Sequence, residues 1–499
     1  MWLSGFRTFF LADLTSHRLS DLAYARWFIG IAVLGGLAAA AILLHRLFEF
    51  WQAICTWSFI SVSPFLLAQS RRVHTDALAT IFIFLTVLLF LCYCVSFQKR
   101  RFVVLSGIAF GLACLSKSYA LILLLWFPLC LWLFRPNNTA SRMLLSNAFE
   151  IGLLFFNSTF LTIFVVWPLF WNPISVLLGT CLLGFIAFLP YALKSKRYTK
   201  SILGVNAFVL IACTGYALKT VWLVFNKVNW AVTTPHNVEH FFLGKIVADP
   251  GPLFYPLVIS IKSTPLTVPL AIFGVILLWK QRKDTHRQGN WFRIAFSMIC
   301  GVLPFILCLS LTAKKFGRYL LPVFPMIDML AGLGLFCFLK WVGSRFKAVL
   351  VQQAGQIVCV VLVFVLTLLP VFALHPYYGI YHNLYWKATD LTKITTVGDG
   401  SGLDIAAKYL NQKPDAHQMT VQVSTLSAGL FQYYFIGSVY QLPPKHAKEP
   451  TSPPPVEYEV VYIRDSQIGW IPQEGTRDGN LEHVITLNGI DRVWIYRVR

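Results

Sequence analysis

Long apolar stretches separated by short basic or polar segments make up the first three quarters of the chain. Most run for about 17 to 25 residues with almost no charge, the length that an α-helix needs to cross a hydrocarbon layer about 30 Å thick. We therefore predict an all-α, multi-pass membrane bundle with about twelve spans. The predicted spans are 26–44, 50–69, 76–96, 102–116, 118–134, 149–170, 175–193, 202–224, 264–280, 293–312, 319–340 and 349–374.

After residue 375 the pattern changes to that of a small α/β domain. Residues 401–414 have apolar positions at helical spacing, begin at a serine and end before Pro414, which predicts a helix. Short alternating or β-branched runs predict strands at 419–424, 458–463, 483–489 and 492–498. We thus expect three regions: an N-terminal segment 1–25, a membrane domain 26–374 and an α/β domain 375–499.

Charge gives the expected orientation. The chain of 499 residues has a net charge of +21, of which residues 1–374 hold +22 and residues 375–499 hold −1. The basic loops fall on one side of the predicted bundle, which predicts a cytoplasmic location for that side and explains the charge without nucleic acid. These loops contain residues 99–101, 135–142, 194–200, 280–293 and 340–347. The α/β domain and the long aromatic loop 225–263 are then extracytoplasmic, in a protein of the inner cell membrane.

Asp76 is the first candidate for chemistry on the outer side. It ends the segment SRRVHTDAL, in which Arg72 and His74 precede it, and a carboxylate in this setting can orient a sugar hydroxyl, a metal ion or a phosphate-binding arginine. The alternative is structural, because Asp76 can also cap the helix that it begins and pair with Arg72 four residues earlier.

Cations on the outer side form a second group of candidates. Lys117 lies between two apolar runs, and Lys314, Lys315 and Arg318 lie within five residues at the outer end of another predicted span. Basic residues at this position oppose the cytoplasmic bias and indicate an anionic partner such as a phosphate group. The alternative is that they anchor the helices among lipid headgroups.

Histidines and acids of the long loop complete the candidates. His236, Glu239 and His240 can serve as an acid/base group or as metal ligands, although their spacing is a weak signal on a loop. A metal requirement is left open, with a divalent ion as the candidate. Asp328, within a predicted span, is either a structural residue or part of a polar cavity.

Several of these motifs occur in an order that resembles one family. The segments SRRVHTDAL, LACLSKSYALIL, WPLFWNP, HFFLGKIVADPGPLFYP, STPLTV and KKFGRYLLPVFP follow one another within about residues 22–375. The set resembles bacterial GT-C glycosyltransferases that use lipid-linked sugars, in particular the protein mannosyltransferase and aminoarabinose transferase group. Residues 401–414 and the C-terminal strands also resemble the outer domain of some members.

The resemblance implies transfer of a sugar from polyprenyl phosphate to an extracytoplasmic acceptor, which is a lipid, a glycan or a protein. It implies that Asp76 is catalytic, that Lys117 binds phosphate, and that Lys315 and Arg318 clamp the donor phosphate. The remaining substrate-binding candidates are Arg72, His74, Tyr319 and His236.

One part of the family pattern is absent. Only 25 residues precede the segment LAYARWFIGIAVLGGL, which resembles the second span of the family, so the first span and its acidic outer loop are not matched. This leaves a non-catalytic, truncated relative as an alternative. A second alternative, from another class, is a polyprenyl-lipid sugar transporter or flippase, which also needs a polar cavity within a helical bundle.

Overall fold

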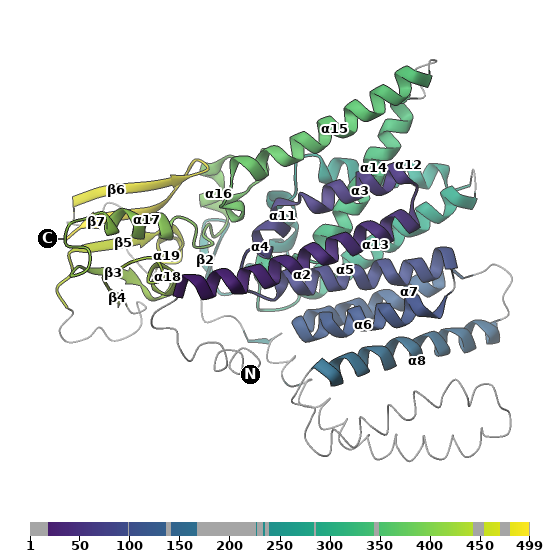
Figure 1. Cartoon of the computed structure of the whole chain (residues 1–499), viewed down its shortest axis with the longest axis horizontal. Helices are drawn as coiled ribbons and strands as arrows, with labels where there is room; N and C mark the ends of the chain where they lie inside the picture. Colours follow the sequence, from purple (N-terminus) through teal and green to yellow (C-terminus); the bar gives the residue numbers. More distant parts are fainter. Residues whose placement is uncertain are drawn as a thin grey trace, which may run out of the picture.

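The computed structural model describes residues 18–97, 99–135, 141–166, 226, 233–234, 239–283, 286–343, 349–442, 454–469 and 480–498. In these residues the chain forms a helical bundle with a small sheet domain at one end (Figure 1). The predicted spans 175–193 and 202–224 lie outside the described residues.

Apolar helices form the bundle, as the hydrophobic pattern predicts. Those of the first half are α2 (Arg18–Leu47), α3 (Phe50–Ser61), α4 (Pro64–Ser70), α5 (Asp76–Cys92), α6 (Arg100–Ser116), α7 (Trp126–Leu133) and α8 (Ser141–Val166). Short π- and 3₁₀-helices, η1 (Tyr93–Phe97) and η2 (Ser118–Leu125), follow α5 and precede α7. Those of the second half are α11 (Phe254–Lys262), α12 (Thr267–Gln281), α13 (His286–Ser310), η4 (Gly317–Leu320), α14 (Val323–Gly343) and α15 (Val349–Ala373).

Four of the described helices are long and apolar enough to cross a membrane, and up to six spans result if two bent pairs each count as one. The bent pairs are α3 with α4, at 55°, and α11 with α12, at 101°. Shorter apolar helices cover Ser118–Leu133, Glu150–Ile163 and Val360–Ala373. The chain is therefore a helical membrane protein, and the number of about twelve spans stays a prediction.

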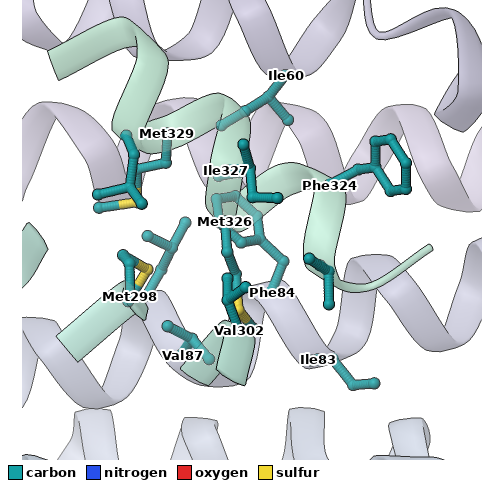
Figure 2. Close-up of a cluster of buried hydrophobic side chains, with 14 of the residues drawn as sticks. Ile60, Ile83, Phe84, Val87, Met298, Val302, Phe324, Met326, Ile327 and Met329 are labelled. Atoms are coloured by element: carbon teal, nitrogen blue, oxygen red, sulfur yellow. The ribbon is translucent and has the colours of Figure 1, made fainter. Parts of the chain in front are cut away.

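Helix α14 is the most buried of the four long apolar helices that the structure describes. Figure 2 shows side chains of α3, α5, α13 and α14 that pack together, among them Ile60, Phe84, Met298 and Met326, and all four are fully buried. Glycines let neighbouring helices approach α14 closely, since a Cβ on Gly334 would lie 1.9 Å from the carbonyl oxygen of Leu270. Such small residues are typical of helix packing within membranes, where close van der Waals contact replaces hydrophobic burial as the driving force.

The C-terminal domain contains a five-stranded mixed sheet in the order β4-β3-β5-β7-β6. Strand β3 is parallel to β4 and β5, whereas β7 is antiparallel to β5 and β6. The strands are β3 (Thr420–Ser424), β4 (Ser438–Leu442), β5 (Tyr458–Tyr462), β6 (Asn480–Leu487) and β7 (Ile490–Arg497). The helices are α16 (Ala388–Ile394), α17 (Leu403–Asn411), α18 (Thr425–Phe431) and α19 (Ile463–Gln467). The sequence thus predicted four of these strands and α17, but not β4.

The segment before α11 contains a short antiparallel hairpin. Its strands are β1 (His240–Phe242) and β2 (Lys245–Val247), and the backbone N–H of Leu243 between them donates to the carbonyl oxygen of Ile394 in α16. The hairpin therefore joins the loop 225–263 of the membrane domain to the C-terminal domain.

The two ends of the bundle differ in chemistry. The turns after α4 and α6 lie at the end that carries the sheet domain (Figure 1). The C-terminal ends of α5, α7, α12 and α14 lie at the opposite end of the bundle. The turns next to Asp76 and Lys117 and the helix ends next to the predicted basic loops therefore lie at opposite ends of the bundle.

Candidate functional site

Asp76 begins α5 and lies inside the protein, with its side chain 1% exposed. The preceding residues 71–75 form turns and bends, and α5 starts at Asp76. The predicted pairing with Arg72 does not form, because Arg72 contacts a different carboxylate. Asp76 is a buried acid at the mouth of the bundle, where ionisation requires nearby cations.

Four side chains surround the Asp76 carboxylate. His74 Nδ1 lies 2.6 Å from Oδ2, although its direction does not satisfy hydrogen-bond geometry, and the Tyr119 hydroxyl donates to Oδ1 at 3.3 Å. Lys117 Nζ lies 3.5 Å from Oδ1, and Arg318 Nε lies 3.6 Å from Oδ2. Three chain segments that are remote in sequence therefore meet at one carboxylate, as predicted for the ends of apolar helices on one face.

Lys117 and Arg318 contact Asp76 only loosely. Both distances exceed that of a strong charge-assisted hydrogen bond, which is about 2.7–2.9 Å. Burial lowers the pKa of Lys117; Asp76 opposes this effect, and Arg318 adds to it. The guanidinium of Arg318 also lies over the Phe316 ring, 4.5 Å from its centroid. Two cations thus share one carboxylate and retain capacity for a further anion.

Tyr319 belongs to the same group through its ring. Its centroid lies 6.1 Å from that of Tyr119 and 5.6 Å from that of Phe316. The two tyrosines therefore form an aromatic wall beside Asp76.

Lys315 does not join this group. Its side chain is 1% exposed, and its ammonium donates to Asp249 Oδ1 and to the carbonyl oxygen of Thr312, each at 2.6 Å. The charge is thus already paired by the loop that follows β2. The pairing leaves Arg318 as the member of the predicted clamp that reaches Asp76.

Arg72 faces the C-terminal domain. Its Nη2 lies 2.8 Å from Asp399 Oδ2 and donates to the carbonyl oxygen of Asp399 at 3.0 Å. Burial opposes ionisation of Asp399, but Arg72, Arg492, the Ser401 backbone and Lys262 outweigh it and lower the pKa of Asp399. The turn before Asp76 is thereby tied to a carboxylate 327 residues later in the chain.

A cavity of about 300 Å³ adjoins these groups, between the bundle and the sheet domain. Phe65, Phe254 and Val258 provide apolar walls, while Arg72 and Arg318 are among its charged walls. The cavity is therefore amphiphilic, with cations on one part and aromatic side chains on another.

Sequence reasoning missed Tyr119 and Asp399. Tyr119 follows Lys117 by two residues in LSKSY, so the sequence did offer a signal that it lies close to the Lys117 site. Asp399 lies in the glycine-rich run VGDGSGLD, in which Gly398 and Gly400 have positive φ angles. That run predicts a turn but not a partner in the membrane domain.

The remaining candidates do not join the Asp76 group in the part of the chain that the structure describes. His236 lies outside the described residues. In the part of the chain that the structure describes, no three His, Cys, Asp or Glu side chains gather as metal ligands. The Asp76 group also fits a divalent cation poorly, because Lys117 and Arg318 already place positive charge against the carboxylate. Asp328 is buried in α14, 3.5 Å from the Thr267 hydroxyl, and lies apart from this group.

Comparison with known sequences gives no assignment. No family model matches the chain. No curated protein matches it either.

Comparison with solved structures gives weak likenesses. ArnT from Cupriavidus metallidurans bound to undecaprenyl phosphate is 13% identical, with a TM-score of 0.47, and the match covers 94% of this chain and 83% of that one. The archaeal oligosaccharyltransferase AglB from Archaeoglobus fulgidus is 12% identical, with a TM-score of 0.40 over 84% of this chain. This chain spans about half of AglB, 53% of its length. Both TM-scores are below 0.5, so we take no residue role from these proteins.

Proposed function

We propose that the protein is a membrane glycosyltransferase of the GT-C type that transfers a sugar from polyprenyl phosphate to an acceptor hydroxyl outside the cytoplasm. The observation that carries the proposal is the Asp76 group: one buried carboxylate, a partly exposed histidine and two loosely engaged cations at the mouth of an apolar bundle. A lipid-linked sugar phosphate requires this combination, because its tail needs apolar helices and its headgroup needs cations.

His74 and Asp76 act together on the acceptor in this proposal. The His74 side chain is 34% exposed while that of Asp76 is 1% exposed, so the histidine is the group that an acceptor hydroxyl can reach. The acceptor oxygen attacks the anomeric carbon, and His74 takes its proton while Asp76 stabilises the resulting imidazolium. The bond between the anomeric carbon and the phosphate oxygen breaks, and polyprenyl phosphate leaves with the electron pair.

Lys117 and Arg318 stabilise the departing phosphate. Negative charge increases on the leaving oxygen in the transition state, and cations held in a partly buried site stabilise it without reorganisation. Tyr319 and Tyr119 line the same place and offer an aromatic surface to the sugar ring. No step requires a metal ion.

A transfer assay tests the proposal. The purified protein in nanodiscs is given polyprenyl phosphate carrying a radiolabelled sugar together with a membrane extract as the source of acceptor, and labelled product is measured. Release of free polyprenyl phosphate with labelled acceptor supports transfer. Movement of intact donor across sealed vesicles, without product, would instead identify a flippase.

The orientation is tested separately. We propose that the C-terminal domain is extracytoplasmic and the basic turns are cytoplasmic. A cysteine introduced at exposed Ser438 should react with an impermeant maleimide in spheroplasts, whereas one at exposed Lys283 should react only after the membrane is opened. The opposite labelling pattern would place the Asp76 group on the cytoplasmic face and overturn the proposal.

A further inference from the structure

The cavity between the bundle and the sheet domain is strongly cationic. It is lined by the side chains of Arg72, Lys262, Arg318, Arg464 and Arg492, against two acids, Glu239 and Asp399. Sequence analysis singled out neither Arg464 nor Arg492, because both belong to the near-neutral C-terminal domain. Five cations against two carboxylates give a net charge of +3 in a space of about 300 Å³.

Titrating groups on the cavity wall respond to this positive potential. Burial lowers the pKa of His382, and both Lys262 and Arg492 lower it further, although the Ile380 carbonyl opposes them. Burial also lowers the pKa of Arg464, with Arg318 adding to the effect and Asp465 and Tyr462 opposing it. Cations from the two domains therefore repel one another across the cavity.

Arg492 is held in this cavity without full compensation. It is 3% exposed, its Nε has no hydrogen-bond partner, and its Nη1 lies 3.9 Å from Asp399 Oδ1, beyond hydrogen-bond distance. A buried guanidinium without direct hydrogen bonds is unfavourable unless an anion completes its environment. Lys262 is partly satisfied, since it donates to the carbonyl oxygens of Gly379 and Tyr381.

We propose that this cavity binds an anionic group of the acceptor, a phosphate or a carboxylate, between Arg464, Arg492 and Lys262. The inference rests on the proposed function. Arg318 both lines the cavity and contacts Asp76, so an acceptor anchored here holds its hydroxyl next to the donor phosphate. The apolar wall of Phe65, Phe254 and Val258 accommodates the uncharged part of the same molecule.

Equilibrium binding in phosphatidylcholine nanodiscs tests the site with two probes, glycerol 3-phosphate and polyprenyl phosphate. Arg464→Gln and Arg492→Gln should each weaken glycerol 3-phosphate binding about tenfold, the effect of one charge-assisted hydrogen bond, and leave polyprenyl phosphate within twofold. Lys117→Gln should instead weaken binding of polyprenyl phosphate about tenfold and leave binding of glycerol 3-phosphate within twofold. Arg497→Gln, an exposed change in the same strand as Arg492, is the matched control and should alter neither.

The outcomes separate the two proposals. Unchanged binding of glycerol 3-phosphate by both Arg464→Gln and Arg492→Gln would overturn the proposed acceptor site. An equal loss of polyprenyl phosphate binding would also overturn it, because the cavity would then belong to the donor site. Failure of the proposed function would appear instead as absent transfer, with anion binding retained.

Repeating the titration in phosphatidylglycerol nanodiscs distinguishes a lipid headgroup from a soluble phosphate. If phosphatidylglycerol competes with glycerol 3-phosphate and Arg464→Gln abolishes this competition, the ligand is a lipid headgroup. If phosphatidylglycerol does not compete, the ligand is a soluble or glycan-borne anion. Because Arg492 contacts Asp399, the thermal midpoint of each variant is recorded.

Discussion

Asp76 and Asp399 are both carboxylates held among cations, but they are held differently. Asp76 is 1% exposed, and its cations, Lys117 and Arg318, stand 3.5 and 3.6 Å away. Asp399 is 18% exposed, and Arg72 binds both its carboxylate, at 2.8 Å, and its carbonyl oxygen. The first group leaves its cations incompletely paired, whereas the second satisfies Arg72 by close contacts.

The difference indicates which charges remain available to a ligand. A cation in close contact with a carboxylate has little to gain from a further anion, since the new contact must replace an existing one. Lys315, paired with Asp249 at 2.6 Å, belongs with Arg72 in this respect. We therefore expect substitutions at the Asp76 group to change chemistry and donor binding, and substitutions at Asp399 to change the junction between the domains.

Loss of His74 should have the largest effect. His74→Ala should lower the rate of sugar transfer by about 10²- to 10⁴-fold, the usual contribution of a general base, while donor binding is nearly retained. Asp76→Asn should abolish transfer similarly, and the double variant should be no slower than the slower single one, because the two residues act as a unit. Transfer rates and donor binding are measured in nanodiscs. His417→Ala, at an exposed position, is the control, and an active His74→Ala enzyme would remove the histidine from the mechanism.

Loss of the loosely held Arg318 guanidinium should have the next largest effect. Arg318→Ala should weaken binding of polyprenyl-phosphate sugar about 10- to 150-fold, equivalent to about 1.5–3 kcal/mol for a charge-assisted contact. Arg318→Lys should recover only part of the loss, because the planar fork is gone. Lys315→Met should change donor binding less than twofold, since its ammonium is already paired. Equal losses for Arg318→Ala and Lys315→Met would contradict the distinction between loose and close pairs.

The close pair between Arg72 and Asp399 should contribute to stability in a pH-dependent way. Asp399→Asn should lower stability by about 1.5–3 kcal/mol, measured by thermal unfolding of the full chain in nanodiscs. The pKa of Asp399 is lowered below its usual 3.8, so its contribution is fully present above pH 3.8 and is lost as pH falls through the lowered value. Asp399→Asn should remove this acid-dependent loss. A parent protein with the same acid profile as the variant would show that the pair does not stabilise the junction.

A pair on the edge strand of the sheet domain should matter least. In the sheet domain Lys413 pairs with Glu482, and this lysine, Tyr409 and Tyr458 lower the pKa of Glu482 to about 2 even though burial opposes them. Glu482→Gln should nevertheless cost at most about 1 kcal/mol, because both side chains remain partly exposed to screening solvent and the pair does not join the two domains. The same thermal assay measures it beside Asp399→Asn. A larger cost for Glu482→Gln than for Asp399→Asn would reverse the ranking.

Sequence alone predicted the helices better than the contacts between them. The run 349–374 corresponds to α15 and the run 26–44 lies within α2, because an uninterrupted apolar stretch leaves few alternatives to a helix in a membrane. The break between α3 and α4 was not predicted, since residues 50–69 form one apolar run that was expected to be a single span.

The same contrast holds within the candidate site. Asp76, Lys117 and Arg318 were expected on one face because each lies at one end of an apolar run. Counting the spans between the basic loops places these three ends on the same side of the bundle. The pairing of Lys315 with Asp249 was not predictable, since its partner comes from an irregular loop 66 residues away. Arg72 gave a misleading local signal: spacing of four favours Asp76, but the irregular turn directs it toward Asp399 instead.

The link between Arg72 and Asp399 also has a consequence for biosynthesis. The two residues are 327 positions apart, so a ribosome that adds about 5–20 residues per second reaches Asp399 roughly 16 to 65 seconds after Arg72. Throughout this interval the turn beside Asp76 exists without the carboxylate that fixes it. Newly made protein therefore completes this turn only once its last domain has emerged and folded, and nascent chains released early should insert into the membrane with the turn unfinished.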